Sequence, residues 1–567
     1  MRWILLCTLG LFGMTALLGG CSCAEEWKRA APAVFAPKEK KVKACVKEPA
    51  WTLFVDATQG SDQASGKCAK SDGKGCGPLK SLSVAFSKAK AGDAIHLQPG
   101  TWKEDLQFKQ SGSKGKPIIL GSTGKAVIEG LIDLKGHSHI TFWGVTLHSR
   151  DGRSWVLAKQ GEHHISFEYV GFDSFNGVGV AFQGVEMLKG HDIRFCGCAM
   201  GQWLGDMFYA REVDRLDFAY NDGSQGRGDH AILAWTGKDL RVRNNTFHNP
   251  WDRVLHITDG RTIKSTGAVI ENNVFVLSNW DRKSRRPVTD NDQSDGGGAW
   301  EVVRLLGKRH IFRNNLVLAA GKGVGHPCSG ALTFTTFSNS YYHTVSYAHI
   351  RVYHNTFSGN ELNDIAFLTN ATPESLSDNR ILRNVFSGSG THAISWCKKE
   401  LPRPEWWIQG NLFSTQARLQ DGEGNSITLG VIKRSFWKKN FTSGMSFQDA
   451  ASWQKKWSHS QRADLWTHFQ LAQKTEKAPP LAILTQDTKD ATNLALSDAF
   501  VFSDGGGMVP GDTILVEQQP VKILRIIDAN HIEVSNKVTA AKGAMVSFVG
   551  GSSSPGVYNS PEPGKSK

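Results

Sequence analysis

The chain has 567 residues, ten of them cysteines, and a formal net charge of +13 at pH 7. The excess of basic residues favours an anionic partner, although it equally describes a basic surface that only keeps the protein in solution. Ten cysteines are typical of an exported protein, which argues against a compartment that keeps thiols reduced.

The first 20 residues have the pattern of a secretion signal. Arg2 supplies a positive charge, an apolar run extends to Leu18, and small residues precede Cys21. This pattern indicates a signal peptide rather than a membrane span. It resembles a bacterial lipobox, so we predict a lipoprotein signal at 1–20 with Cys21 acylated, an ordinary signal peptide being the alternative. Residues 21–50 are predicted to tether the protein to the bacterial membrane, at the outer membrane or cell surface.

A short frame containing asparagine recurs through the middle of the chain. It reads Arg-Asn-Asn-Thr-Phe at 243–247, and related frames stand at 271–275, 313–317, 354–357, 383–386 and 410–413. Such repetition means that one supersecondary unit is stacked many times. Each frame lies in a short β-rich run, and Gly, Asn and Asp separate the runs, which indicates strands and turns.

Aligning the frames on Asn245 sets a register for the stack. The equivalent positions are Val145, Val170, Cys198, Asn221, Asn245, Asn273, Asn315, Asn355, Asn384 and Asn411. Gaps of about 22–28 residues suit one coil of three strands, and longer gaps suit a coil with an outward loop. At the bend asparagine tolerates the left-handed conformation, and its amide can bond the asparagine of the next coil. We therefore predict a structural ladder in a parallel β-helix.

Several motifs outside the ladder match secreted proteins of this type. They are Phe54-Val-Asp-Ala-Thr-Gln-Gly-Ser-Asp62, Gly77-Pro-Leu-Lys-Ser-Leu82, Ala91-Gly-Asp-Ala-Ile-His-Leu-Gln-Pro-Gly100, Gly115-Lys-Pro-Ile-Ile119 and Arg351-Val-Tyr-His-Asn-Thr-Phe357. With them the chain resembles the right-handed parallel β-helix, pectate-lyase-like superfamily over roughly 52–560. It has distant similarity to polysaccharide lyases of the chondroitinase-B and alginate-lyase type. The resemblance implies a short capping helix at Lys80–Lys90, but this fold hosts lyases, hydrolases, epimerases and adhesins.

The predicted fold is therefore all-β, a right-handed parallel β-helix with an N-terminal cap and a small C-terminal β module. The β-helix with its cap is expected at 51–440, and a closing helix and strand at 441–490. Alternating β-rich runs predict the β module at 491–550, which we expect to cap the open end of the solenoid. The tail at 551–567 is predicted to be disordered.

Acidic residues recur before the asparagine frames at nearly the coil spacing. They are Glu186, Asp206, Asp229, Asp252 and Glu301. We expect them to form one longitudinal strip, with the last step spanning about two coils. Such carboxylates repel one another unless a cation or an arginine lies among them. Clustered oxygens of this kind suit Ca²⁺.

The resemblance implies β-elimination from a uronic-acid polysaccharide, in which Ca²⁺ or basic residues neutralise the uronate and a base removes the C5 proton. On that hypothesis Ca²⁺ would be bound by Asp206, Asp229, Asp252 and Glu301. Substrate would be bound by Asp229, Asp252, Glu301 and, from an inserted loop, Arg282 and Arg285. The base would be His230 or His256, while Arg253 and Arg304 would hold the carboxylate. An anionic polysaccharide fits an exported basic solenoid better than nucleic acid does, and we expect a monomer.

Two other functions remain open. Asp229 and Asp252 could be the acid and base of a glycoside hydrolase, or the strip could be a non-catalytic binding or structural surface. The familiar lyase residues are not reproduced, because the lysine position falls at Thr236 and the arginine position near Thr258. The acidic pair becomes Asp229 and Ala231. Whether the protein is an enzyme is thus left open by its sequence.

The cysteines allow few assignments. Cys68 and Cys76 flank a polar loop and are predicted to form a disulfide. Cys196 and Cys198 form a Cys-x-Cys pair on a predicted strand, where residues two apart share one face. They are interpreted as stacked core thiols in preference to half of a metal site. No pairing is assigned to the remaining cysteines of the folded region and tether, namely Cys23, Cys45, Cys328 and Cys397.

Overall fold

The computed structural model describes residues 45–548 with interruptions. The longest lie at 277–300, 429–481 and 497–512. Shorter ones fall at 149–153, 174–183, 202–205, 225–229, 236, 249–252, 259–265, 308–309, 319–329, 336, 339–342, 345–349, 354, 359, 361–362, 369–378, 383, 388–391, 397–406, 410–411, 414–417, 421–425, 518 and 528–530. No helix among the described residues is long and apolar enough to cross a bilayer.

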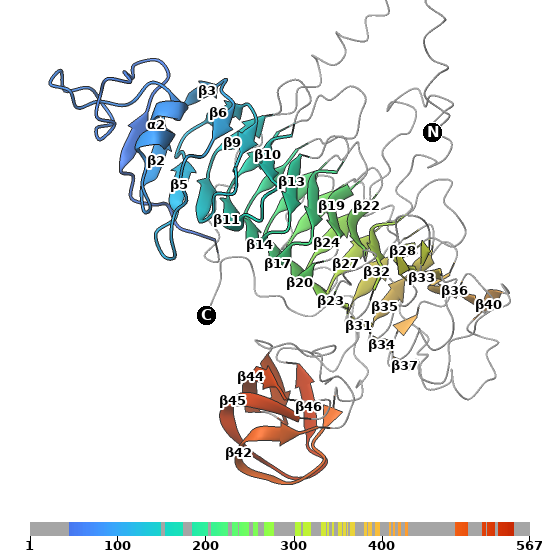
Figure 1. Cartoon of the computed structure of the whole chain (residues 1–567). Helices are drawn as coiled ribbons and strands as arrows, with labels where there is room; N and C mark the ends of the chain where they lie inside the picture. The colour runs from blue at the N-terminus through green and yellow to red at the C-terminus, as the bar shows by residue number, and fades with distance from the viewer. Residues whose placement is uncertain are drawn as a thin grey trace, which may run out of the picture. The chain divides into compact units, whose positions relative to one another are not determined.

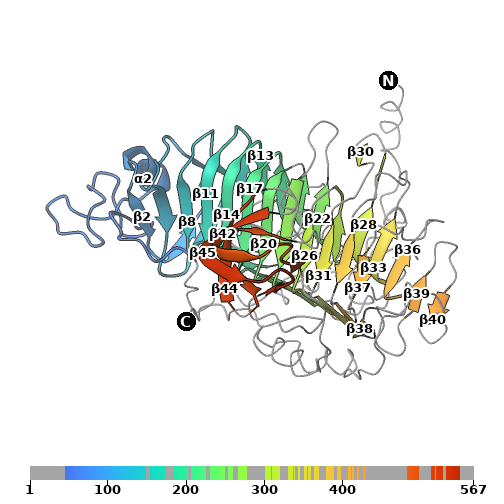
Figure 2. The ribbon, with the colours of Figure 1, turned by 90° about the horizontal axis from the view of Figure 1, so that it is seen from below.

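Three long sheets wind along one axis, with strands that follow in chain order (Figures 1 and 2). Sheet A contains β1 (Leu53–Val55), β2 (Ala94–Leu97), β5 (Ile118–Gly121), β8 (Ile140–Trp143), β11 (His163–Glu168), β14 (His191–Cys196), β17 (Asp214–Ala219), β20 (Lys238–Arg243), β23 (Thr266–Glu271), β26 (Ile311–Arg313), β31 (Arg351–Tyr353), β34 (Arg380–Leu382) and β37 (Trp407–Gln409). Sheet B contains β3 (Gly100–Trp102), β6 (Ala126–Glu129), β9 (Thr146–His148), β12 (Gly171–Phe172), β15 (Ala199–Met200), β18 (Asp222–Ser224), β21 (Thr246–His248), β24 (Val274–Val276), β27 (Leu316–Leu318), β32 (Thr356–Ser358), β35 (Val385–Ser387) and β38 (Leu412–Phe413). Sheet C contains β4 (Leu106–Gln107), β7 (Ile132–Asp133), β10 (Val156–Ala158), β13 (Val185–Leu188), β16 (Phe208–Arg211), β19 (His230–Trp235), β22 (Arg253–Thr258), β25 (Val303–Leu305), β28 (Gly330–Thr335), β33 (Asn363–Leu368), β36 (Ile394–Trp396), β39 (Arg418–Gln420) and β40 (Ser426–Thr428).

Each coil contributes one strand to each sheet, and neighbouring coils pair in parallel, as at β14 and β17. The exception is the final pair of sheet C, β39 and β40, which is antiparallel. A small antiparallel hairpin, β29 (Phe337–Ser338) with β30 (His343–Thr344), lies outside the three sheets. The predicted all-β parallel β-helix is therefore confirmed.

The solenoid core is a stack of equivalent apolar side chains. Phe142, Phe167 and Phe195 lie in register in sheet A, with ring centroids 5.0 and 4.6 Å apart. Their alternation with more exposed residues along each strand follows from the two-residue period of a β-strand. Burying such rings is the main driving force for closing each coil on the next.

The asparagine ladder is present at the predicted positions. The backbone N–H and side-chain Nδ2 of Asn245 both donate to Oδ1 of Asn273, each at 3.0 Å. Asn273 donates in the same way to Asn315. The ladder extends from Asn221 to Asn384 among the described residues, and Asn411 lies outside them.

The left-handed residue of the bend is one position earlier than predicted. Asn244, Asn272 and Asn314 have φ values of 57°, 57° and 50°, whereas the ladder asparagines that follow them do not have positive φ. The first asparagine of each Asn-Asn pair therefore makes the turn, and the second supplies the amide that links the coils.

The predicted capping helix is α2 (Leu82–Lys88), within the range Lys80–Lys90. Ser81 caps its N-terminus by accepting a hydrogen bond from the Val84 N–H. Leu82, Ala85 and Phe86 are buried, and the Phe86 ring lies 4.4 Å from that of Phe108. The helix thus covers apolar residues at the first end of the solenoid (Figure 1).

Two cysteine pairs have disulfide geometry. One is the predicted pair Cys68–Cys76, and the other joins Cys45 to Cys196. Cys198 is a buried free thiol. The prediction that Cys196 and Cys198 share a strand face is wrong, because β14 ends at Cys196 and the chain bends at Gly197, whose φ is 68°.

The C-terminal module is a six-stranded antiparallel sheet, described here by itself. Its order is β41 (Ala482–Ile483), β46 (Met545–Phe548), β43 (Thr513–Val516), β44 (Gln519–Ile526), β45 (His531–Ala540) and β42 (Thr488–Ala495). A bridge between Leu484 and Leu496 links the two edge strands, so the sheet closes on itself around a leucine, isoleucine and valine core. It starts at Ala482, before residue 491. The predicted tail, 551–567, lies outside the described residues.

Candidate functional site

The acidic residues that were predicted to form one strip do not all occupy the same position in the strands of sheet C. Glu186 pairs with Tyr209, three positions after Asp206. Phe208 pairs with Ile232, and Leu255 pairs directly with Val303. Extending these pairs places Asp206, His230, Arg253 and Glu301 at one position. The predicted strip is therefore wrong: Asp206 and Glu301 share their position with His230 and Arg253 rather than with the aspartates predicted there, and Glu186 lies three residues away from it. The strands β22 and β25 lie on adjacent coils joined by a long insertion, rather than two coils apart.

A buried carboxylate between two arginines lies at this position. Oε2 of Glu301 accepts hydrogen bonds from Nε of Arg253, at 3.0 Å, and from Nε of Arg304, at 2.5 Å. The Glu301 side chain is fully buried, whereas those of Arg253 and Arg304 are 14% and 19% exposed. We call these three residues the arginine clamp. Its formal charge is positive, because two guanidinium groups share one carboxylate.

The clamp keeps Glu301 ionised. Burial would raise the pKa of this carboxyl, but the charges of Arg304 and Arg253, with their hydrogen bonds, lower its pKa to about 2. The second oxygen, Oε1, is buried and accepts no hydrogen bond from the described residues. A buried carboxylate oxygen without a donor is costly, so a donor from water or a ligand would be favourable here.

His256 lies beside the clamp. It pairs with Arg304 across β22 and β25, so the two Cα atoms are about 4.8 Å apart. The same outward column of sheet C continues to Tyr209 and Glu186, and the carboxylate of Glu186 forms an ion pair with Lys159. His256 is 5% exposed. A histidine and an arginine on adjacent coils thus face the same side of the sheet.

The other predicted site residues are only partly described. Asp206 lies two residues before β16, and His230 begins β19, where its backbone pairs with Arg253. Asp229 and Asp252 lie outside the described residues, as do Arg282, Arg285 and the lipidation site Cys21. Of the positions that depart from the lyase pattern, Ala231 and Thr258 are buried.

The described residues near Glu301 do not fit a Ca²⁺ site. Calcium requires several oxygen ligands, but Oε2 of Glu301 already accepts from two arginines, whose charge would oppose a second cation. Among the described residues, the clusters of potential metal ligands do not include Glu301 or Asp206. The arginines themselves provide the positive charge at this position.

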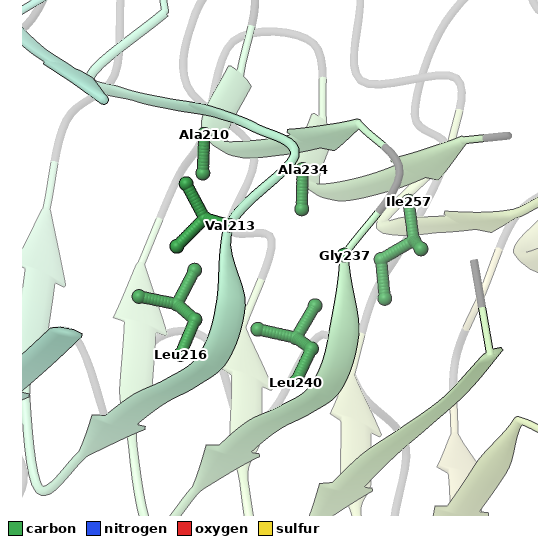
Figure 3. Close-up of a pocket in the computed structure, with 7 residues that line it drawn as sticks. All are labelled: Ala210, Val213, Leu216, Ala234, Gly237, Leu240 and Ile257. Carbon is green, nitrogen blue, oxygen red and sulfur yellow. The ribbon is translucent and has the colours of Figure 1, made fainter. Parts of the chain in front are cut away.

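A small void in the solenoid is unrelated to this site. It is lined by Ala210, Val213, Leu216, Ala234, Gly237, Leu240 and Ile257, from successive coils (Figure 3). This lining is apolar, and the space is about that of one water molecule. It offers no charged or polar side chain to a sugar.

Two features of the described solenoid were missed from the sequence. One is the partner of Cys196, because Cys45 is 151 residues away and has no pattern around it. The other is a group of histidines at the start of β8, β11 and β14. The sequence did contain a pattern that indicates this group, since His139 and His164 each precede an isoleucine and these two isoleucines pair in neighbouring coils.

The chondroitinase B family model matches residues 78–154, which form the first coils of the solenoid and less than half of the chain. No curated protein matches the sequence. Among solved structures, the PL6 family alginate lyase AlyGC is 16% identical over 64% of this chain and 52% of its own, with a TM-score of 0.40. This chain therefore spans about half the length of AlyGC.

Two further structures are similar to a comparable degree. A mannuronic acid specific polysaccharide family 6 lyase from human gut microbiota is 13% identical over 67% of this chain and 90% of its own, with a TM-score of 0.39. Pectate lyase Pel9A is 13% identical over 65% of this chain and 81% of its own, with a TM-score of 0.40. At these identities no residue role is carried over to this chain.

Proposed function

We propose that the protein binds a uronic-acid polysaccharide at the arginine clamp and cleaves it by β-elimination. The observation that carries the proposal is the pair of arginines on consecutive coils, Arg253 and Arg304, held by one buried carboxylate. Arginine is well suited to this role because its planar guanidinium matches a carboxylate in geometry and charge. The match of residues 78–154 to the chondroitinase B family agrees with a substrate of this class.

The proposed chemistry uses the neighbouring histidine. Arg304 and Arg253 would neutralise the carboxylate of the uronate, which makes the C5 proton more acidic. His256 would accept that proton through a ring nitrogen, and the C4–O bond would break as the C4–C5 double bond forms. The glycosidic oxygen leaves with its electron pair and takes a proton from solvent.

A second candidate is binding without cleavage. It is favoured by the departures from the lyase pattern, since Thr258 and Ala231 stand where the related lyases have an arginine and an acidic residue. In that case the clamp would hold the uronate and His256 would have no catalytic role.

One experiment separates these functions. The purified full chain is incubated with alginate, polygalacturonate, chondroitin sulfate and dermatan sulfate, with Ca²⁺ or with EDTA, and the ultraviolet absorbance of unsaturated uronate is followed. A rise in absorbance on one polymer supports elimination. New reducing ends without that absorbance indicate a hydrolase, and binding without either product indicates the binder. No binding and no product on any polymer would refute the proposal.

We propose further that the protein is exported and lipid-anchored through Cys21. The two cysteine pairs of the described region support an oxidising compartment, because disulfides persist there. Mass spectrometry of membrane-bound protein from a bacterial host should find Cys21 as an acylated N-terminus. A Cys21→Ala variant should be unprocessed or released without lipid; an unmodified Cys21 in the mature protein would contradict the anchor.

A further inference from the structure

Histidines gather where the chain enters three consecutive strands of sheet A. His139 precedes β8, His163 and His164 begin β11, and His191 begins β14, where Asp192 follows. His139 and His164 occupy equivalent positions one coil apart, because Ile140 pairs with Ile165. Both have the left-handed backbone conformation, with φ values of 57° and 54°. The repeated bend therefore presents imidazoles from adjacent coils on one corner of the solenoid.

Three of these rings converge. His139 and His164 are stacked with centroids 4.4 Å apart, and His163 lies 5.3 Å from His139, edge to face. The Nδ1 atoms of His163 and His164 are 2.9 Å apart. At this distance either one nitrogen donates a hydrogen bond to the other, or both lone pairs are directed at one cation. Two nitrogens that ligate one ion at about 2.0–2.1 Å lie about 3 Å apart.

The neighbouring carboxylate, that of Asp192, already forms an ion pair with Arg215. Nε and Nη2 of Arg215 donate to the two oxygens of Asp192, at 2.7 and 2.8 Å. Nη2 of Arg215 also lies 3.0 Å from Nδ1 of His191. A metal held by His164, His191 and Asp192 would therefore have to compete with a guanidinium. The trio His139, His163 and His164, which we call the histidine trio, avoids this competition.

The environment favours neutral rings, the form that binds metal. Burial lowers the pKa of His139, and the nearby His164 lowers it further. Burial lowers the pKa of His163 as well, and His191, His164 and His139 act in the same direction, whereas Asp192 opposes them. The His164 side chain is 46% exposed, which gives an ion access from solvent.

We propose that the histidine trio binds one first-row divalent transition ion, Zn²⁺, Ni²⁺ or Cu²⁺. Imidazole nitrogen is a preferred ligand for these ions, whereas Ca²⁺ and Mg²⁺ take oxygen. At least one candidate ligand atom from each histidine lies within 4.8 Å of the others. The bound ion joins two coils at the corner between sheets C and A. This site is independent of the arginine clamp, so the failure of either proposal leaves the other intact.

The test is a titration of the full chain, without a polyhistidine tag, with each metal salt in chelator-free buffer. Wild-type protein should bind one equivalent of Ni²⁺ or Cu²⁺ and melt at a higher temperature with metal than without it. Electron paramagnetic resonance of the Cu²⁺ form should show nitrogen ligands. His139→Asn and His164→Asn should each weaken binding at least about tenfold. Asparagine is chosen because it tolerates the left-handed backbone, and metal-free melting checks that both variants fold.

Two control variants make the test specific. His137→Ala removes a nearby histidine that contacts Ser111 instead of the trio, and it should bind metal like wild type. His191→Ala removes a ligand of the competing set and should change the affinity by less than about threefold. The proposal is overturned if the wild type does not bind, if both asparagine variants bind normally, or if His191→Ala alone abolishes binding.

Discussion

At the residue scale, the candidate site depends on a carboxylate that is costly to bury. Removing Glu301 from water is unfavourable, and two guanidinium groups offset this cost only while both stay in place. The pKa of about 2 means that the charge persists throughout the range in which the protein would work. Glu301 therefore orients both Arg253 and Arg304.

We expect Arg304→Ala to lower kcat/KM on the polysaccharide substrate by about 100-fold or more, since it removes a charged donor that stabilises developing negative charge. Arg304→Lys should recover part of the loss, because the charge returns without the fork geometry. Initial rates at several substrate concentrations measure both effects. Arg241→Ala, an exposed arginine on sheet A, is the control and should retain wild-type kinetics. Unchanged kinetics in Arg304→Ala would remove the clamp from the mechanism.

The buried side chain of His310 is expected to make the stability of the protein depend on pH. Its Nε2 donates to the Leu306 carbonyl and its Nδ1 accepts from the Ala268 N–H, which fixes the neutral ring. Burial lowers its pKa to about 4, whereas an unfolded chain has the ordinary value of 6.5. The unfolded state therefore takes up the proton first as the pH falls. The associated stability is full above about pH 6.5 and is lost between about pH 6.5 and 4, on the order of 3 kcal/mol.

Denaturant unfolding between pH 7 and 4 measures this loss. In His310→Gln the group cannot titrate, so the free energy of unfolding should fall less steeply over this range than in wild type. Gln107→Ala, which changes an uncharged side chain at an exposed position on β4, should retain the wild-type slope. Parallel curves for His310→Gln and wild type would show that His310 does not titrate as predicted.

At the element scale, the coils are joined by the asparagine ladder and the strand register. In Asn315, Oδ1 accepts two hydrogen bonds from Asn273 while Nδ2 donates to the Ile270 carbonyl and to Asn355. These partners are buried, so each would lose its hydrogen bond without gaining water.

Asn315→Ala should therefore lower the free energy of unfolding by about 3 kcal/mol or more, because several buried donors and acceptors lose their partner at once. Thermal and denaturant unfolding provide the measurement. Gln107→Ala, which removes an amide from an exposed position on β4, should change stability by less than about 0.5 kcal/mol. Equal losses in the two variants would mean that the ladder hydrogen bonds stabilise the protein no more than an exposed amide does.

The register of sheet C explains why the site was only partly predictable. Arg253, His256, Glu301 and Arg304 were identified as neighbours from their distance to the frames, but Glu301 was grouped with Asp252 instead of Arg253. A slip of one residue exchanges the two faces of a strand, and charged residues that are adjacent in sequence do not indicate which face is inside. The pairing of Leu255 with Val303 resolves this.

At the scale of the whole molecule, a long-range link ties the N-terminal segment to the middle of the solenoid. Cys45 pairs with Cys196, the Val46 N–H donates to Oε2 of Glu168, and the Val46 carbonyl accepts from Nε1 of Trp143. The last residues of the predicted tether, 21–50, are thus held against sheet A, so the folded part of the chain begins earlier than residue 51. The strands of the C-terminal sheet bury leucine, isoleucine and valine side chains such as Leu494, Ile514 and Val534.

Replacing Cys45 and Cys196 by serine should cost about 2–5 kcal/mol of stability, because the disulfide restricts a loop of 151 residues in the unfolded chain. Non-reducing peptide mapping verifies the bond, and calorimetry measures the loss. Replacing Cys68 and Cys76 by serine should lower the stability less, because their disulfide closes a loop with a sequence separation of only 8. The opposite order would contradict the predicted role of the longer link.

The sequence alone determined that the chain folds as a parallel β-helix and where the coils repeat. These properties follow from local periodicity, since each coil uses the same strand, bend and asparagine as its neighbour. Only the tertiary structure decided that Glu301 joins Arg253 and Arg304, that Cys45 meets Cys196, and that three histidines converge at one corner. Such contacts join residues from different coils or distant segments, so they depend on exact register and folding, which one-dimensional spacing does not specify.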